Sequence, residues 1–118
     1  MKSFLMTLIT ACLLTAAPIT ITYAQNFDKA DKAYEAGDYT TAAKEFRLLA
    51  EQGDAGAQFN LGYRYSIGQG VPQDYVLAHM WFNIAAASGH EYALKARDLL
   101  ASLMTSNQIA EAQQHARD

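Results

Sequence analysis

The side chains of this chain that could do chemistry are its histidines, serines and carboxylates, and their spacing matches no common catalytic or metal-binding pattern. His79, His90 and His115 are eleven and twenty-five residues apart, and no two histidines follow the His-x-x-x-His spacing of a helical zinc site. We therefore expect these histidines to be solvated or to cap helices, and we expect no metal site.

The serines and one glycine-rich segment also lack the context that a reactive centre needs. Neither Ser66 nor Ser88 stands in a Gly-x-Ser-x-Gly elbow. Gly68-x-Gly70 lacks the preceding strand and the Gly-Lys-Ser/Thr of a phosphate-binding loop, so it is interpreted as a turn. The carboxylates are scattered, with no pair placed to separate their pKa values. The sequence predicts no catalytic residue and no cofactor.

The first 24 residues have the pattern of a secretory signal peptide. Lys2 is the only charge before Asp28, a mainly apolar run follows it, and small residues stand before Gln25, which predicts cleavage after Ala24. Two alternatives stay open. The run is just long enough for an uncleaved anchor, and Ile9-Thr10-Ala11-Cys12 resembles a lipoprotein box in which Cys12 would carry a lipid.

Composition limits what a mature chain of residues 25–118 could be. The one cysteine leaves with the signal, which excludes a disulfide scaffold, a thiol enzyme and a cysteine-ligated zinc site. Loss of Lys2 takes the net charge from −3 to −4, and no basic patch stands out. Nucleic acid is therefore not an expected partner, and no membrane insertion is expected after signal cleavage.

A segment of the chain repeats itself thirty-six residues later. Seven identities share this offset without a gap: Asp38 and Asp74, Tyr39 and Tyr75, Ala42 and Ala78, Phe46 and Phe82, Ala50 and Ala86, Gly53 and Gly89, and Ala57 and Ala93. A period of roughly 20 to 50 residues is typical of stacked structural units. Each unit buries its apolar face against its neighbours, so the repeat predicts an array rather than one irregular core.

The spacing of apolar residues predicts helices throughout residues 27–118. The expected helices cover 27–36, a segment from Asp38 to Gly53, 55–65, a segment from Asp74 to Gly89, about 91–103, and a last helix that begins at Thr105. Asp38 and Asp74 are expected N-caps, and Gly53 and Gly89 expected C-terminal glycines. Thr105 with Gln108 predicts a capping box, and the polar end of the last helix suits the end of an array.

Residues 50–89 resemble the Sel-one-like repeat, an offshoot of the tetratricopeptide helix pairs. The resemblance rests on Ala50 to Gln58, on Leu61-Gly62 and Tyr65, on the Gly68 to Tyr75 loop motif, and on Ala78, Trp81, Ala85-Ala86 and Gly89. It implies an all-α, right-handed solenoid of helical hairpins that mediates protein–protein contacts, with Trp81 packed in the core. We expect about two repeats and a C-terminal capping helix, in units of about 27–53, 54–89 and 90–118.

The expected recognition surface lies mainly on the third helix. At 100° per residue, Phe59 and Tyr63 fall opposite the stripe of Leu61 and Tyr65. First helices of each pair line the concave face of a tetratricopeptide array, which makes these aromatics candidate contacts if they are exposed; the alternative is that both pack on neighbouring helices. The candidate protein-binding residues are Phe59, Asn60, Tyr63 and Arg64, with a rim of Asp31 and Tyr34.

The sequence therefore predicts a protein-binding adaptor, exported to the periplasm or outside a bacterial cell, with no catalytic chemistry of its own. One alternative is an assembly factor held by a membrane or lipid anchor. A second is a cell-wall or β-lactam hydrolase related to cysteine-rich repeat proteins, which needs a nucleophile and a base that the sequence does not display.

Overall fold

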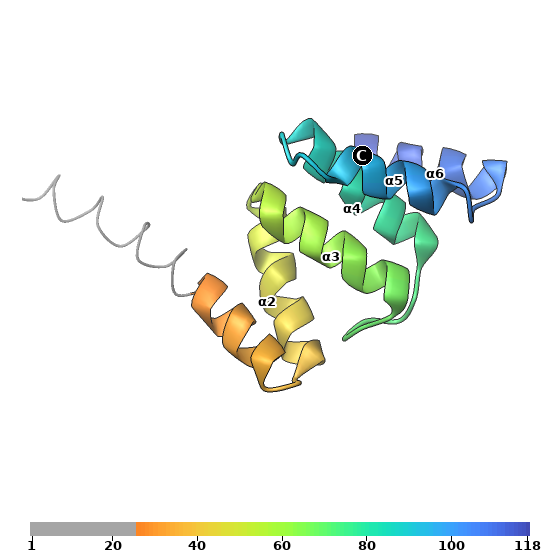
Figure 1. The fold of residues 1–118 in the computed structure, drawn as a ribbon. Helices are drawn as coiled ribbons and strands as arrows, with labels where there is room; N and C mark the ends of the chain where they lie inside the picture. The colour runs from red at the N-terminus through yellow and green to blue at the C-terminus, as the bar shows by residue number, and fades with distance from the viewer. Residues whose placement is uncertain (1–25) are drawn as a thin grey trace, which may run out of the picture.

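A computed structural model describes residues 26–118, all of whose regular elements are helices (Figure 1). Residues 26–35 are helical, and the later helices are α2 (Tyr39–Glu51), α3 (Ala55–Ile67), α4 (Tyr75–Ala87), α5 (Ala93–Ala101) and α6 (Ser106–Arg117). The predicted signal peptide, residues 1–24, lies outside the described residues. The all-α class that the periodicity predicts is confirmed for the rest.

Aspartate side chains begin three of the helices. The carboxylates of Asp38, Asp54 and Asp74 accept hydrogen bonds from the backbone N–H three residues later, at 3.2, 2.7 and 3.0 Å. Each bond satisfies a first-turn donor that has no partner inside the helix. Gly53 and Gly89 follow the ends of α2 and α4 with φ of 97° and 91°, a conformation that side chains rarely adopt.

The helices pack as a stack of hairpins. α3 packs against α2 on one side and α4 on the other, and α4 also packs against α5 and α6 (Figure 1). Helices α2 to α5 contact mainly their neighbours in sequence, as in the tetratricopeptide-like solenoid expected from the repeat, whereas α6 packs on α4 rather than on α5. α6 covers α4, and most of its other residues are exposed.

Equivalent residues of the repeat occupy equivalent places in the core. Phe46 and Phe82 are only 4% and 3% exposed. Phe46 packs against Phe27 at 6.5 Å between ring centroids, and Phe82 packs against Phe59 at 5.5 Å. Burying such a ring contributes about 1.5–3 kcal/mol. Each of these repeated phenylalanines therefore packs against a phenylalanine of the preceding helix.

The two hairpin loops differ in length, so the 26–35 helix and α3 are not separated by the thirty-six residues that separate α2 from α4. Residues 36–38 join the 26–35 helix to α2, whereas residues 68–74 join α3 to α4. Four extra residues in the second loop mean that the 26–35 helix aligns with α3 at an offset of 32. Ala30 then matches Gly62, and both are buried.

Two predicted helix boundaries are wrong. α3 continues beyond Tyr65 to Ile67, because Gly68 is the first residue with a left-handed backbone, at φ 70°. α5 is shorter than the predicted 91–103, because the position equivalent to the cap Asp54 holds His90 and no side chain caps the helix. The predicted capping box of α6 is confirmed by bonds of 2.9 and 3.2 Å between Thr105 and Gln108.

Candidate protein-binding groove

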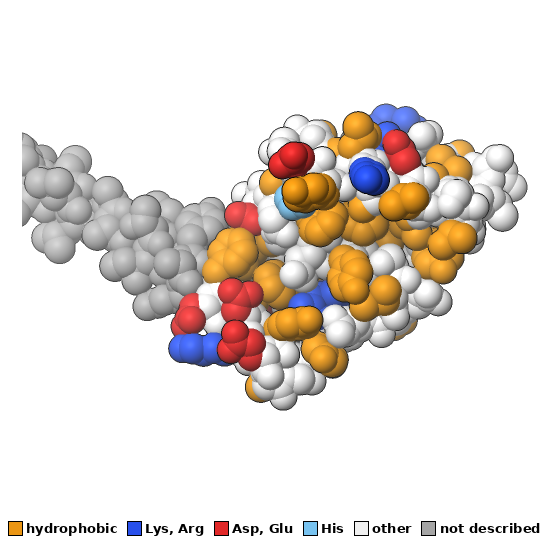
Figure 2. Space-filling model, in the orientation of Figure 1, with side chains coloured by type: hydrophobic (Ala, Val, Ile, Leu, Met, Phe, Trp, Pro, Cys, Tyr) orange, Lys and Arg blue, Asp and Glu red, His pale blue; other side chains and the backbone are white. Residues whose placement is uncertain are grey.

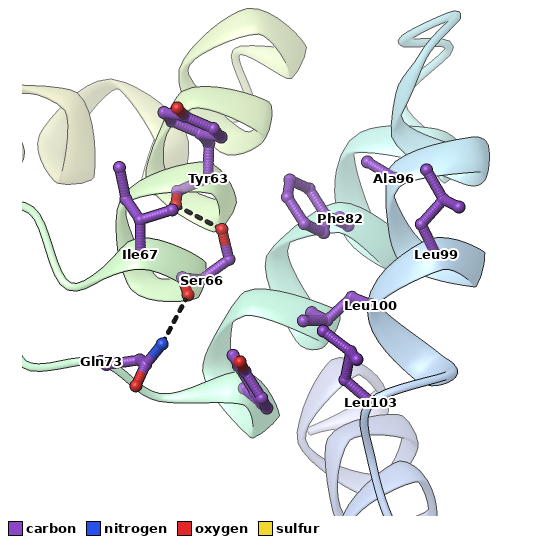
Figure 3. Close-up of a pocket in the computed structure, with 10 residues that line it drawn as sticks. Tyr63, Ser66, Ile67, Gln73, Phe82, Ala96, Leu99, Leu100 and Leu103 are labelled. Carbon is purple, nitrogen blue, oxygen red and sulfur yellow. Dashed lines mark hydrogen bonds between the residues drawn. The ribbon is translucent and has the colours of Figure 1, made fainter.

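An open apolar groove of about 630 Å³ lies between α3 and α5. Tyr63 and Ile67 of α3 form one wall. Leu99 of α5 and Leu103 in the turn after it form the other, and Phe82 of α4 lies between the walls (Figure 3). The remaining lining residues are Ser66, Gln73, Tyr75, Ala96 and Leu100. None of the lining side chains is charged, so the groove offers an apolar surface with a polar end.

The wall side chains are unusually exposed for large apolar residues. The exposed fractions are 51% for Tyr63, 48% for Ile67, 64% for Leu99 and 67% for Leu103. Leu99 and Leu103 stand thirty-six residues after Tyr63 and Ile67, so equivalent positions of the repeat form the two walls. Contiguous exposed apolar side chains of this kind are typical of binding grooves.

The floor of the groove is fixed by close packing between α3 and α4. A Cβ atom added to Gly62 would lie 2.7 Å from the ring of Phe82, so the glycine lets the two helices approach closely. Phe59 packs on the same ring and stacks on His90 at 4.2 Å between centroids. Phe82 therefore presents a rigid surface to the groove.

Two side chains hold the polar end of the groove by donating hydrogen bonds to backbone carbonyls. The Ser66 hydroxyl donates to the carbonyl of Tyr63 at 2.6 Å, and the Gln73 amide donates to the carbonyl of Ser66 at 3.0 Å (Figure 3). The bond from Gln73 ties the long 68–74 loop to the last turn of α3. The loop thereby closes one end of the space between α3 and α5.

Arg64, which the sequence offers as a candidate binding residue if its face is exposed, is buried. It is 2% exposed, and its guanidinium donates to Asn60 Oδ1 at 2.6 Å and to Gln69 Oε1 at 3.3 Å. The rings of Tyr34 and Phe46 each lie 5.1 Å from its guanidinium carbon. Burial lowers the pKa of Arg64. Arg64 therefore joins the 26–35 helix, α2 and α3 rather than facing solvent.

The other predicted contact residues divide between surface and core. Tyr63, Tyr34 and Asp31 are exposed, whereas Phe59 and Asn60 are half-buried. Phe59 follows the alternative left open by the sequence, packing on neighbouring helices. Only Tyr63 among the predicted residues lines the groove, and the role of the set in binding stays a prediction.

Sequence reasoning missed Ile67, Leu99 and Leu103. The leucines belong to the apolar pattern of the fifth helix, where the expected environment is a core, yet both are exposed. The signal that could have found them is the repeat itself, because adding thirty-six to Tyr63 and Ile67 gives the other wall.

The expectation of solvated or capping histidines is wrong for His79. It is 3% exposed, and its Nδ1 has no hydrogen-bond partner among the residues that the structure describes. Burial lowers the pKa of His79, and the Arg97 cation lowers it further, against an opposing effect of Asp98. His115 is exposed, with Nε2 3.6 Å from Glu111 Oε1.

Residues 26–118 contain neither a cluster of metal-ligating side chains nor a membrane-spanning helix. No three His, Cys, Asp or Glu side chains of this part are grouped as metal ligands. No helix within the same range has both the length and the apolar character to cross a membrane.

The stacked hairpins and the open groove define a helical-repeat protein of the tetratricopeptide-like class. Residues 55–90 match the family model of the Sel1 repeat, so the chain carries a Sel1 repeat formed by α3 and α4. Sel1 repeats are units that generally mediate protein–protein interaction. The match covers the segment whose glycine-loop motif carries the resemblance in the sequence.

Proposed function

We propose that this protein is an exported adaptor that binds a protein partner in the α3–α5 groove and has no catalytic chemistry of its own. The Sel1 repeat supports protein binding, and the groove supplies a surface for it. The single observation that carries the proposal is the pair of uncharged walls with four exposed apolar side chains. Burying such side chains against a partner is favourable by about 25 cal/mol per Å².

The groove has the composition of a small binding hot spot. Tyr63 is a rigid amphipathic ring, a type enriched at interface centres, and Phe82 forms a packed floor beneath it. The hydroxyls of Ser66 and Ser88 donate to carbonyls of their own helices, at 2.6 and 2.9 Å. That bonding supports a role for these serines in the helix ends rather than as nucleophiles.

A charged side chain in the groove wall should abolish partner binding. We expect Leu99→Asp to reduce recovery of the partner at least tenfold in cross-linking and pull-down from the source cell, because a carboxylate there would be desolvated on binding. Quantitative mass spectrometry of the captured proteins measures the effect. The matched control is Leu48→Asp, which changes a similarly exposed leucine on α2 outside the groove.

The outcome that contradicts the groove is equal recovery by both variants. Tyr63→Ala gives a milder second test on the opposite wall. It is preferable to any change at Phe59, whose ring also supports Phe82. Circular dichroism must show unchanged helicity for each variant.

Export rests on the pattern of residues 1–24 and is tested at the N-terminus of the protein from native cells. Intact mass spectrometry that finds a chain starting at Gln25 supports export with cleavage. A chain with Met1 intact would instead support the anchored alternative, and a lipid on Cys12 would support a lipoprotein.

A further inference from the structure

Exposed pairs stand at matching repeat positions in the 26–35 helix, in α3, and in α5 with the turn that follows it, and we name them the inner-face ladder. The offset of 32 relates the 26–35 helix to α3, and the offset of 36 relates α3 to α5. In this register the ladder consists of Asp31 and Glu35, then Tyr63 and Ile67, then Leu99 and Leu103, all of which are exposed. The ladder therefore changes from acidic to apolar along the stack.

The acidic pair, Asp31 and Glu35, forms no salt bridge within residues 26–118. The pKa of Lys32 is raised by its hydrogen bond with Asp28 and, to a lesser extent, by the nearby Glu35 carboxylate. Asp31 and Glu35 are four residues apart, so they lie side by side on one helix face. Neither forms an ion pair there, whereas the lysines of the same helix are engaged in the pairs Lys29–Glu45 at 3.0 Å and Lys32–Asp28 at 2.8 Å. Two like charges four residues apart on a helix repel each other mildly, and a basic ligand between them would offset this repulsion.

The acidic and apolar parts belong to one continuous face. Figure 2 shows acidic side chains, with a basic side chain at their edge, gathered over the 26–35 helix, and hydrophobic side chains over α3 and α5 on the same side of the molecule. Tyr34 bridges the parts, because its ring lies over the guanidinium of Arg64 on α3. A ligand in the groove can therefore extend towards Asp31 and Glu35.

We infer that the partner docks through a short extended segment with basic residues at one end and apolar residues at the other. The apolar residues enter the α3–α5 groove, and a Lys or Arg pairs with Asp31 and Glu35. This inference rests on the proposed function, which it deepens by naming the chemistry of the partner. The complementarity of charge, with an acidic pair beside an uncharged groove, carries it.

The geometry of packed helices sets the spacing within that segment. Packed helices lie about 8–10 Å apart, which sets the distance from the 26–35 helix to α3. The middle of the groove lies about half that spacing beyond α3, so the acidic pair is about 15 Å from it. An extended chain advances about 3.3 Å per residue, which places the basic residue about five residues from the apolar anchor.

Selection from random 12-residue peptides displayed on phage tests the inference with the protein purified after expression of the full chain. We expect enriched peptides to carry Lys or Arg about five residues from an apolar residue. A synthetic copy should bind the Asp31→Lys, Glu35→Lys variant about tenfold more weakly, because two attractive contacts become repulsive. Changing the basic residues of the peptide to Glu should restore binding to that variant.

A charge-matched control separates local pairing from net charge. The Glu51→Lys, Asp118→Lys variant makes the same change of charge at exposed positions outside the ladder, and it should bind within about twofold of the wild type. Equal weakening by both double variants would overturn the inference.

The remaining outcomes distinguish this inference from the proposed function. If the selected peptides fail to bind the Leu99→Asp variant but bind the Asp31→Lys, Glu35→Lys variant as well as the wild type, the inference alone is overturned. Absence of any enriched peptide, or peptides indifferent to Leu99→Asp, overturns both. A dimer in sedimentation that dissociates with Leu99→Asp would assign the groove to a second copy, and it also overturns the inference.

Discussion

At the residue scale, Arg64 shows how a charged side chain can serve the fold. Its guanidinium is held by two neutral amide oxygens and two aromatic rings, with no carboxylate among the described residues as an ion-pair partner. A planar cation stacks on rings and donates to several acceptors at once, which a lysine could not match. The residue joins three helices below the binding face.

His79 should make stability depend on pH. Its pKa is lowered in the folded protein by burial and by Arg97, so the folded state favours the neutral ring. The unfolded state binds a proton near its ordinary pKa of about 6.5, and stability is therefore lost as the pH falls below that value. We expect the melting temperature to fall from pH 7 to pH 5, and to fall less in His79→Leu.

Thermal unfolding followed by circular dichroism between pH 5 and 8 measures this difference. The control is His115→Gln, which changes an exposed histidine on α6 and should keep the wild-type slope. Parallel curves for the wild type and His79→Leu would show that His79 does not carry the effect.

At the element scale, α3 and α4 can approach closely because Gly62 has no side chain. We expect Gly62→Ala to lower the free energy of unfolding, because its Cβ would lie 2.7 Å from the Phe82 ring and 3.2 Å from the carbonyl oxygen of Ala78. Overpacking costs about 1–3 kcal/mol, which exceeds the gain of about 1 kcal/mol from helix propensity. Urea denaturation measures the net loss.

Gly56→Ala is the matched control for this change. It has the same gain in propensity on the same helix, but its Cβ would meet only the Asp54 carboxylate, at 3.3 Å. We expect it to be neutral or mildly stabilising. Equal stability changes in the two variants would remove the packing explanation for Gly62.

At the scale of the whole molecule, α5 should be the least protected of helices α2 to α5. It has nine residues and no side-chain cap, and α4 is its main packing partner. Because stability in stacked repeats is local, an edge helix opens independently of the rest. Hydrogen exchange should show faster exchange in α5 than in α3 or α4.

His90→Asp supplies the matched variant. An aspartate there would occupy the position of the cap Asp54 in the preceding unit, and we expect slower exchange in α5 even though the stack on Phe59 is lost. Protection of α5 equal to that of α3 in the wild type would contradict this picture.

Much of the fold was predictable because its signals are local. The caps at Asp38 and Asp74, the glycines at 53 and 89, and the Thr105 capping box depend on a few neighbouring residues and the backbone. The groove was less predictable. Leu99 belongs to an apolar helical pattern, and that pattern cannot show whether another helix will cover it.

The sequence alone determined the helices, their repeat and the class of protein, because a period of thirty-six residues and its caps act through short-range backbone geometry and regular stacking. Only the tertiary structure decided which apolar faces are covered. Arg64 is buried because the 26–35 helix and α2 close over it, and Leu99 is exposed because α5 packs on α4 and leaves a groove beside α3. Burial depends on residues distant in sequence.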